Sequence, residues 1–234
     1  MGSQERFNKF RLSLILVVAA AVIGVIQFLI CTGLSMSRYK DYSFANNSLS
    51  DLGCMAYEHH AIFNGSLIFL GLAVTPVFIM MWITDPRRSF SIRATAVFGI
   101  ISTIGLIGVA LSPVDRHFVW HFISLALWLF PMFYMTVSFF TAASRSPYVG
   151  IGFLSAALLM VVIMIAVMLR TELSTLELLQ KAVVVCGLVW LTFIIAFIIQ
   201  SGVYVLKNWD HDDLEKEKLE QEYFTELKTG RVRD

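Results

Sequence analysis

The chain has 234 residues, of which 57% are hydrophobic and 15% are charged, and its mean hydropathy is +0.73. This composition excludes an ordinary soluble globular domain. A net charge of +1 provides no basic field for nucleic acid. Three cysteines are too few for a disulfide framework.

Six long apolar runs fill most of the chain. Crossing a bilayer core takes about 20 apolar helical residues. Spans are predicted at 12–34, 61–84, 94–112, 118–142, 149–169 and 180–206. None contains an acid, and Lys181 is the only Lys or Arg inside them. We therefore predict an all-α, six-transmembrane-helix bundle over residues 1–206, in a multi-pass protein of the cell membrane.

The loops between these runs differ in positive charge. One side holds Arg6, Lys9, Arg11, Arg87, Arg88, Arg93, Arg145 and Lys207, while the other holds Arg38, Lys40, Arg116 and Arg170. Cytoplasmic loops carry the excess of Lys and Arg. Both termini are therefore expected in the cytoplasm. The acids and histidines of the first two loops on the opposite face are expected on the extracytoplasmic side.

The first of these loops, at about 35–60, carries Ser50 and Asp51 in a Ser-Asp-Leu-Gly turn. Asp51 is a candidate general base, although capping a short helix is the commoner role of such an aspartate. His60 and Asn64 are four residues apart at the start of the second run. They would form one inward polar line, in which Asn64 needs a hydrogen-bond partner.

Two cysteines flank this same loop. Cys31 ends the first run and Cys54 lies within the loop. On an oxidising side of the membrane they could pair, or they could simply pack as small apolar residues.

The second loop, Pro113 to His121, carries the densest set of reactive side chains. His117 and His121 lie one helical turn apart, and two imidazoles at this spacing can hold one metal ion, for which zinc is the candidate. His60 would be a third ligand. Asp115 could ligate, activate water or orient an imidazole. The alternative is that both histidines rest their polar edges among lipid headgroups.

Three cations lie near the same face of the predicted bundle. Arg116, Arg170 and Lys181 could together bind the phosphate of a lipid. Snorkelling, in which the charged head reaches water while the stem stays in hydrocarbon, explains them equally well.

From residue 207 onward the composition inverts to a charged segment. Leu214, Leu219 and Leu227 recur at helical spacing, with Glu–Lys pairs between them. A cytoplasmic C-terminal helix and tail is predicted for 207–234.

Several motifs together resemble a known family. These are Ser50-Asp51-Leu52-Gly53, Phe63-Asn64, the run from Gly105 to Asp115, and His121 with Ser124. They resemble the domain-of-unknown-function family 998, which is distantly similar to the Frag, DRAM and Sfk-type membrane proteins. The resemblance implies a six-span fold, and its signature positions are Ser50, Asp51, Gly53, Asn64, Pro113, Asp115 and His121. Through those eukaryotic proteins it also implies a role with lipids. This chain departs from the pattern at Ser112, where an aromatic is expected before Pro113.

Two functional hypotheses follow. The favoured one is a non-catalytic protein that binds or organises lipid, with Asp51, Asp115 and His121 joining the first loop to the fourth span. In it, Ser50, Asn64, Arg116 and Arg170 are the candidate binding residues. The alternative is a metal-assisted lipid hydrolase or transferase with Asp51 or Asp115 as the base and His60, His117 and His121 as ligands. Membrane lipids are the expected partners, and a homo-oligomer is left open.

Overall fold

The computed structural model describes residues 3–84, 90–143 and 173–229. The described elements are helical: α1 (Ser3–Arg38), the short 3₁₀ helix η1 (Ser50–Gly53), α2 (His60–Thr84), α3 (Phe90–Leu111), α4 (Phe118–Ala143) and α6 (Leu173–Thr229). Five of these are long and apolar enough to cross a membrane, which confirms the all-α class and five of the predicted spans. The predicted span at 149–169, together with Arg170, lies outside the described residues.

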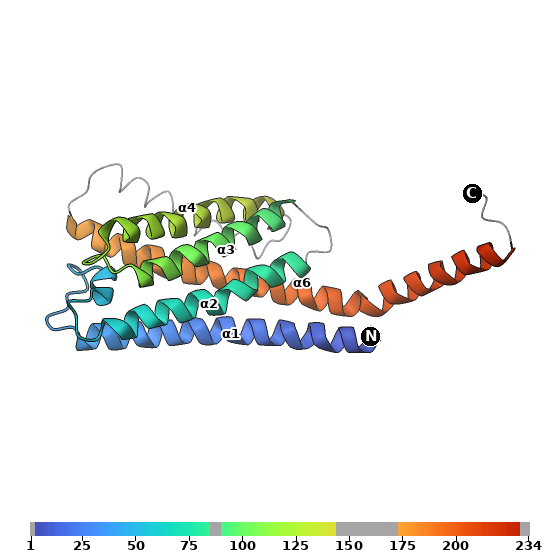
Figure 1. Ribbon diagram of the computed structural model, residues 1–234, viewed down its shortest axis with the longest axis horizontal. Helices are drawn as coiled ribbons and strands as arrows, with labels where there is room; N and C mark the ends of the chain where they lie inside the picture. The colour runs from blue at the N-terminus through green and yellow to red at the C-terminus, as the bar shows by residue number, and fades with distance from the viewer. Residues whose placement is uncertain (1–2, 85–89, 144–172, 230–234) are drawn as a thin grey trace.

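The helices lie lengthwise beside one another (Figure 1). α1 packs on α2, α2 on α3 and α3 on α4, while α6 contacts both α1 and α2. The loop with η1, the turn between α3 and α4 and the start of α6 gather at one end of the bundle, here called the polar end. α1 begins at the opposite end, where α6 continues beyond the bundle as a single helix to Thr229.

Small residues allow α3 and α4 to approach closely. A Cβ on Gly105 would collide with the backbone of Leu127 and Trp128. One helical turn along, a Cβ on Gly108 would lie 2.6 Å from the Ser124 hydroxyl oxygen. This is the close backbone approach that small residues allow between membrane helices.

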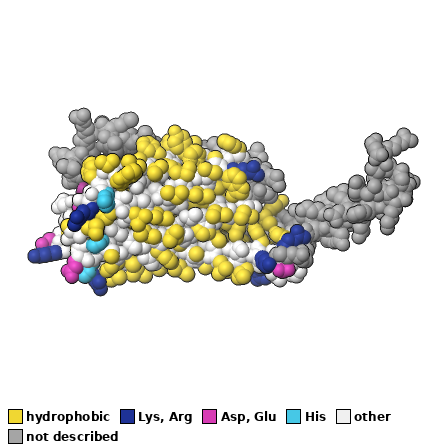
Figure 2. Space-filling model, in the orientation of Figure 1, with side chains coloured by type: hydrophobic (Ala, Val, Ile, Leu, Met, Phe, Trp, Pro, Cys, Tyr) yellow, Lys and Arg dark blue, Asp and Glu magenta, His cyan; other side chains and the backbone are white. Residues whose placement is uncertain are grey.

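The outer surface of the bundle is apolar between its two ends. Figure 2 shows hydrophobic side chains over the middle of the visible face and charged side chains at the ends. Large side chains such as Phe130, which is 68% exposed, contribute to this surface. So much exposed hydrocarbon would be a liability in water but is the surface that a bilayer requires.

Candidate functional site at the polar end

The turn that carries Asp51 is closed by its own side chains. The Ser48 N–H donates to Asp51 Oδ2 at 2.7 Å, and the Asp51 N–H donates to Ser48 Oγ at 3.0 Å. Asn47 Nδ2 also donates to Asp51 Oδ2, at 3.4 Å. This is the reciprocal pattern found in capping boxes. Asp51 is therefore directed into its own loop, although Leu49, the N-cap residue of η1, has no side-chain cap bond.

His121 joins the end of α3 and the first loop to α4. Its Nδ1 lies 2.8 Å from the carbonyl oxygen of Ser112, and its Nε2 lies 3.3 Å from Ser50 Oγ. A carbonyl oxygen only accepts, so Nδ1 carries a proton, and in the neutral ring Nε2 then accepts from the Ser50 hydroxyl. The His121 side chain is only 4% exposed.

Gln180 at the start of the last span completes this connection. Its Nε2 donates to Ser50 Oγ at 2.9 Å, and its Oε1 accepts from the Leu49 N–H at 2.9 Å. The loop is therefore attached to α6 through Gln180 and to α4 through His121. We call Ser50, Gln180, His121 and the Ser112 carbonyl the polar node.

Asp115 provides a second attachment between the two loops. Its Oδ1 accepts from the Met55 N–H at 3.1 Å and its Oδ2 from the Ala56 N–H at 3.0 Å. Partial burial acts to raise the pKa of this carboxyl, but the backbone N–H groups and the neighbouring Arg116 outweigh it, so the Asp115 pKa is lowered. The carboxylate thus remains ionised and bound to the loop.

Gly53 and Asn64 meet where the loop passes the start of α2. Asn64 Nδ2 donates to the Gly53 carbonyl oxygen at 2.9 Å, which supplies the partner that this amide needs near a span. A Cβ on Gly53 would collide with Asn64 Oδ1. Close approach to this amide therefore requires glycine in the Ser-Asp-Leu-Gly turn.

Lys181 points into the same loop. Although it is only 5% exposed, its ammonium donates to the carbonyl oxygens of Asn47 and Glu177 and lies 5.0 Å from the centre of the Phe44 ring. Burial and the nearby Asp51 raise the pKa of Glu177, which Lys181 partly counteracts. Lys181 therefore holds the loop, while Arg116 is exposed and Arg170 lies outside the described residues.

The three histidines proposed as metal ligands have different surroundings. His60 Nδ1 lies 2.7 Å from the Tyr57 carbonyl oxygen. His60, Asn64 and the exposed His117 line one open depression of about 330 Å³, whereas the buried His121 is not among its lining residues. Among the described residues, no three His, Cys, Asp or Glu side chains form a group that could hold a metal ion. The zinc site stays a prediction without support from this geometry.

The cysteines are also unpaired in this structure. Cys31, Cys54 and Cys186 are free thiols. Cys31 Sγ accepts from Gln27 Nε2 at 3.3 Å, and Cys54 Sγ donates to the Ser50 carbonyl oxygen at 3.6 Å. The two candidates for a disulfide therefore each have a local partner.

Five long apolar helices in the described part of the chain define it as a multi-pass helical membrane protein. Residues 22–196 match the family model described as "Protein of unknown function (DUF998)". Because that match covers most of the chain, the protein belongs to the DUF998 family. No curated protein and no solved structure matches it.

Proposed function

We propose that this DUF998 protein is a non-catalytic, lipid-associated membrane protein whose polar end is locked by the polar node. The observation that carries the proposal is that both ring nitrogens of His121 have partners, one in the α3–α4 turn and one in the first loop. Asp115 likewise uses both oxygens on backbone N–H groups of that loop. Because their hydrogen-bonding atoms are occupied in this way, His121 and Asp115 hold segments of the chain together.

The Ser50–His121 pair also has the residue types of a nucleophile and its general base. Three features favour a lock. Ser50 Oγ is already an acceptor for Gln180, and its 3.3 Å distance to Nε2 is long. Neither Ser50 nor His121 lines the His60–His117 depression or a second cavity, of about 90 Å³, that lies among the helices.

Lipid is the partner that the surface favours. The described helices present hydrocarbon to their surroundings, as a bilayer-embedded bundle requires. Arg116 and His117 are exposed next to the lock, at the level where headgroup phosphates would lie if the polar end faces the extracytoplasmic side. In this proposal Arg116, joined by Arg170 as the sequence suggests, contacts those phosphates.

The alternative function is a metal-assisted lipid hydrolase or transferase. One observation supports it: His60 and His117 line the same open depression, beside Asn64. Two imidazoles there would need a further ligand, and His121 would have to leave both of its present partners. This cost makes it the second candidate.

One set of measurements separates these functions. Purified protein is treated with a fluorophosphonate probe, which labels activated serines, and its metal content is measured by mass spectrometry. The lock predicts no labelling of Ser50, sub-stoichiometric zinc and unchanged thermal stability in chelator. Labelling that Ser50→Ala abolishes, or one zinc per chain lost in a His60→Ala/His117→Ala variant, would contradict it.

The lipid partner has its own test. Native mass spectrometry of the full chain, released from phospholipid-containing detergent, should show retained phospholipid, and Arg116→Gln should weaken that retention for anionic lipids most. Arg38→Gln is the matched control, because Arg38 is an exposed arginine at the same end, where α1 terminates. Protein that retains no phospholipid under any mild condition would contradict the lipid proposal and leave the lock intact.

A further inference from the structure

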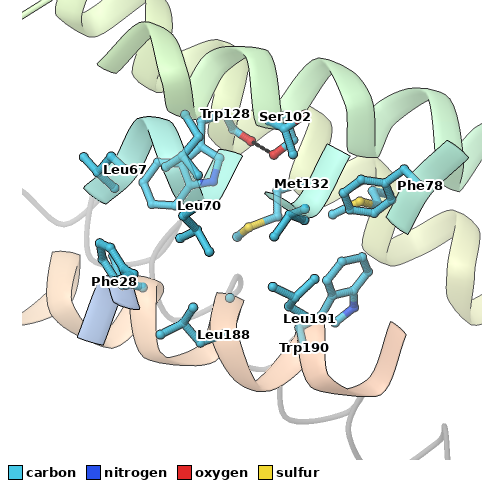
Figure 3. A pocket seen from close by; sticks show the side chains of 16 residues that line it. Phe28, Leu67, Leu70, Phe78, Ser102, Trp128, Met132, Leu188, Trp190 and Leu191 are labelled. Atoms are coloured by element: carbon cyan, nitrogen blue, oxygen red, sulfur yellow. Dashed lines mark hydrogen bonds between the residues drawn. The ribbon is translucent and has the colours of Figure 1, made fainter. Parts of the chain in front are cut away.

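A cavity of about 90 Å³ lies among the helices, away from the polar node. Its walls come from α1, α2, α3, α4 and α6, and Figure 3 shows Phe28, Leu70, Phe78, Met132 and Leu188 around it. In that view the Met132 sulfur is directed into the space from α4. Gly187 of α6 leaves part of the space open, because a Cβ there would meet only Met132 Sδ, at 3.8 Å.

The polar groups in the wall offer little to a polar ligand. The Ser102 hydroxyl donates to the Trp128 carbonyl oxygen at 2.9 Å, and the Thr103 hydroxyl donates to the Ile100 carbonyl oxygen at 2.8 Å. The indole Nε1 of Trp190 has no partner within the described part of the chain. Because both hydroxyls are already bonded within the wall, the largely apolar lining does not suit a charged headgroup or a sugar. An apolar occupant fits, since apolar cavities stay dry and take up hydrocarbon ligands.

The depth of the cavity along the helices indicates which part of a surrounding lipid can reach it. Along α2 its lining extends from Leu67 to Phe78, which is roughly 10 to 27 Å from the polar-end start of that helix at His60. In a bilayer core about 30 Å thick, this depth is centred near the midplane, where the ends of the acyl chains lie. These chains are also the most concentrated apolar molecules around the protein.

We infer that the cavity takes the end of a phospholipid acyl chain from the surrounding bilayer. A space of about 90 Å³ holds a few carbon atoms, since an apolar cavity of about 150 Å³ takes up benzene. The remaining chain and the headgroup therefore stay outside the bundle. This inference rests on the proposed lipid association and identifies the part of the lipid that enters the protein.

The test is photo-crosslinking of the full chain in phosphatidylcholine bilayers whose acyl chains carry a mid-chain diazirine. We expect crosslinks at cavity residues of α4 and α6, such as Met132 and Leu188, in addition to the lipid-facing surface. Gly187→Leu fills the cavity, so we expect about tenfold fewer cavity crosslinks, which corresponds to a tenfold loss of affinity for the acyl chain. Gly33→Leu is the matched control, because a Cβ at Gly33 has nothing within 4 Å.

Crosslinks confined to exposed residues such as Phe130, or cavity crosslinks that Gly187→Leu leaves unchanged, would overturn the inference.

If Gly187→Leu does not fold, a second experiment measures how strongly chain-brominated lipid quenches the fluorescence of Trp190, taken as the difference between the wild type and Trp190→Phe. Trp190 is only 4% exposed. Strong quenching is therefore expected with an occupied cavity, and weak quenching overturns the inference. If phospholipid is retained but no cavity crosslinks form, only the acyl-chain site is contradicted. If no phospholipid is retained at all, the proposed lipid association is contradicted as well.

Discussion

Ser50 Oγ and His121 Nε2 lie 3.3 Å apart, although 71 residues separate them in the chain. Their contact joins η1 to α4, and the Gln180 amide on the same hydroxyl adds α6. The polar end is therefore held by part-buried hydrogen bonds between side chains, which add to the bonds that Asp115, Asn64 and Lys181 make to the same loop.

The first prediction concerns this node. His121→Ala removes both bonds and leaves the Ser112 carbonyl without its imidazole, so the free energy of unfolding should fall by about 1–3 kcal/mol. Thermal unfolding in detergent measures the change. In a double-mutant cycle with Ser50→Ala, the two losses should be less than additive. The exposed His117→Ala is the control and should leave stability unchanged; strict additivity would argue against a shared bond.

Lys181 should be a second determinant of loop order. Lys181→Met keeps the apolar stem but removes the donor for the Asn47 and Glu177 carbonyls, so the free energy of unfolding should fall by about 1–3 kcal/mol. Hydrogen exchange of residues 43–52 should also accelerate. The exposed Lys207→Met is the matched control. A stability equal to that of the wild type would mean that the ammonium contributes no net stabilisation.

The positions of the helices could be predicted from the sequence, whereas the contacts between distant segments at the polar end could not. Helix positions follow from the length and apolarity of the runs, so α2 and α4 begin within one residue of their predicted spans. The sequence also placed Ser50, Asp115 and His121 at one end of the bundle. It paired them wrongly: Asp51 was expected to face Asp115 and His121, but the neighbouring Ser50 makes the contact with His121. Within a short 3₁₀ turn, adjacent side chains point in different directions, and only the path of the loop decides which one faces α4.

Gln180 was missed altogether. Its only signal was a polar pair, Gln180-Lys181, at the entrance of an apolar run, where snorkelling is an adequate explanation for the lysine. The connection from α6 to a loop 130 residues earlier is a property of tertiary packing, and no local pattern encodes it.

The third prediction follows from the lowered pKa of Asp115. A carboxyl whose pKa is lower in the folded state stabilises the protein above its unfolded pKa, about 3.9, and this contribution is lost as the pH falls through the folded value. Asp115→Asn should therefore be less stable than the wild type at pH 7, with the difference shrinking towards pH 3. The difference should be small because the carboxylate is exposed to water. Asp41→Asn serves as control, since Asp41 is exposed at a positive φ of 58° that asparagine tolerates.

A fourth prediction tests the contact between α3 and α4. Gly105→Ala places a Cβ against the backbone of Leu127 and Trp128, so the two helices must separate. Overpacking of this kind costs about 1–3 kcal/mol. Gly33→Ala has open space around its Cβ and should behave as the wild type in the same thermal unfolding experiment. Equal stability of both variants would show that α3 and α4 adjust freely.

The reactivity of the Cys54 thiol can be used to probe the structure of the polar end. Burial, followed by the charges of Asp115 and Asp51, raises the pKa of its thiol to about 11. The thiolate is the reactive form, so maleimide should modify Cys54 slowly at pH 8 in a Cys31→Ser/Cys186→Ser background. Asp115→Asn removes one of the charges that raise the pKa and frees the loop from Asp115, so it should accelerate the reaction and shift the pH–rate profile to lower pH. A wild-type profile with its midpoint near 8.5, the ordinary value for cysteine, would mean that Asp115 and the burial of this loop exert no effect on the thiol in the membrane-embedded protein.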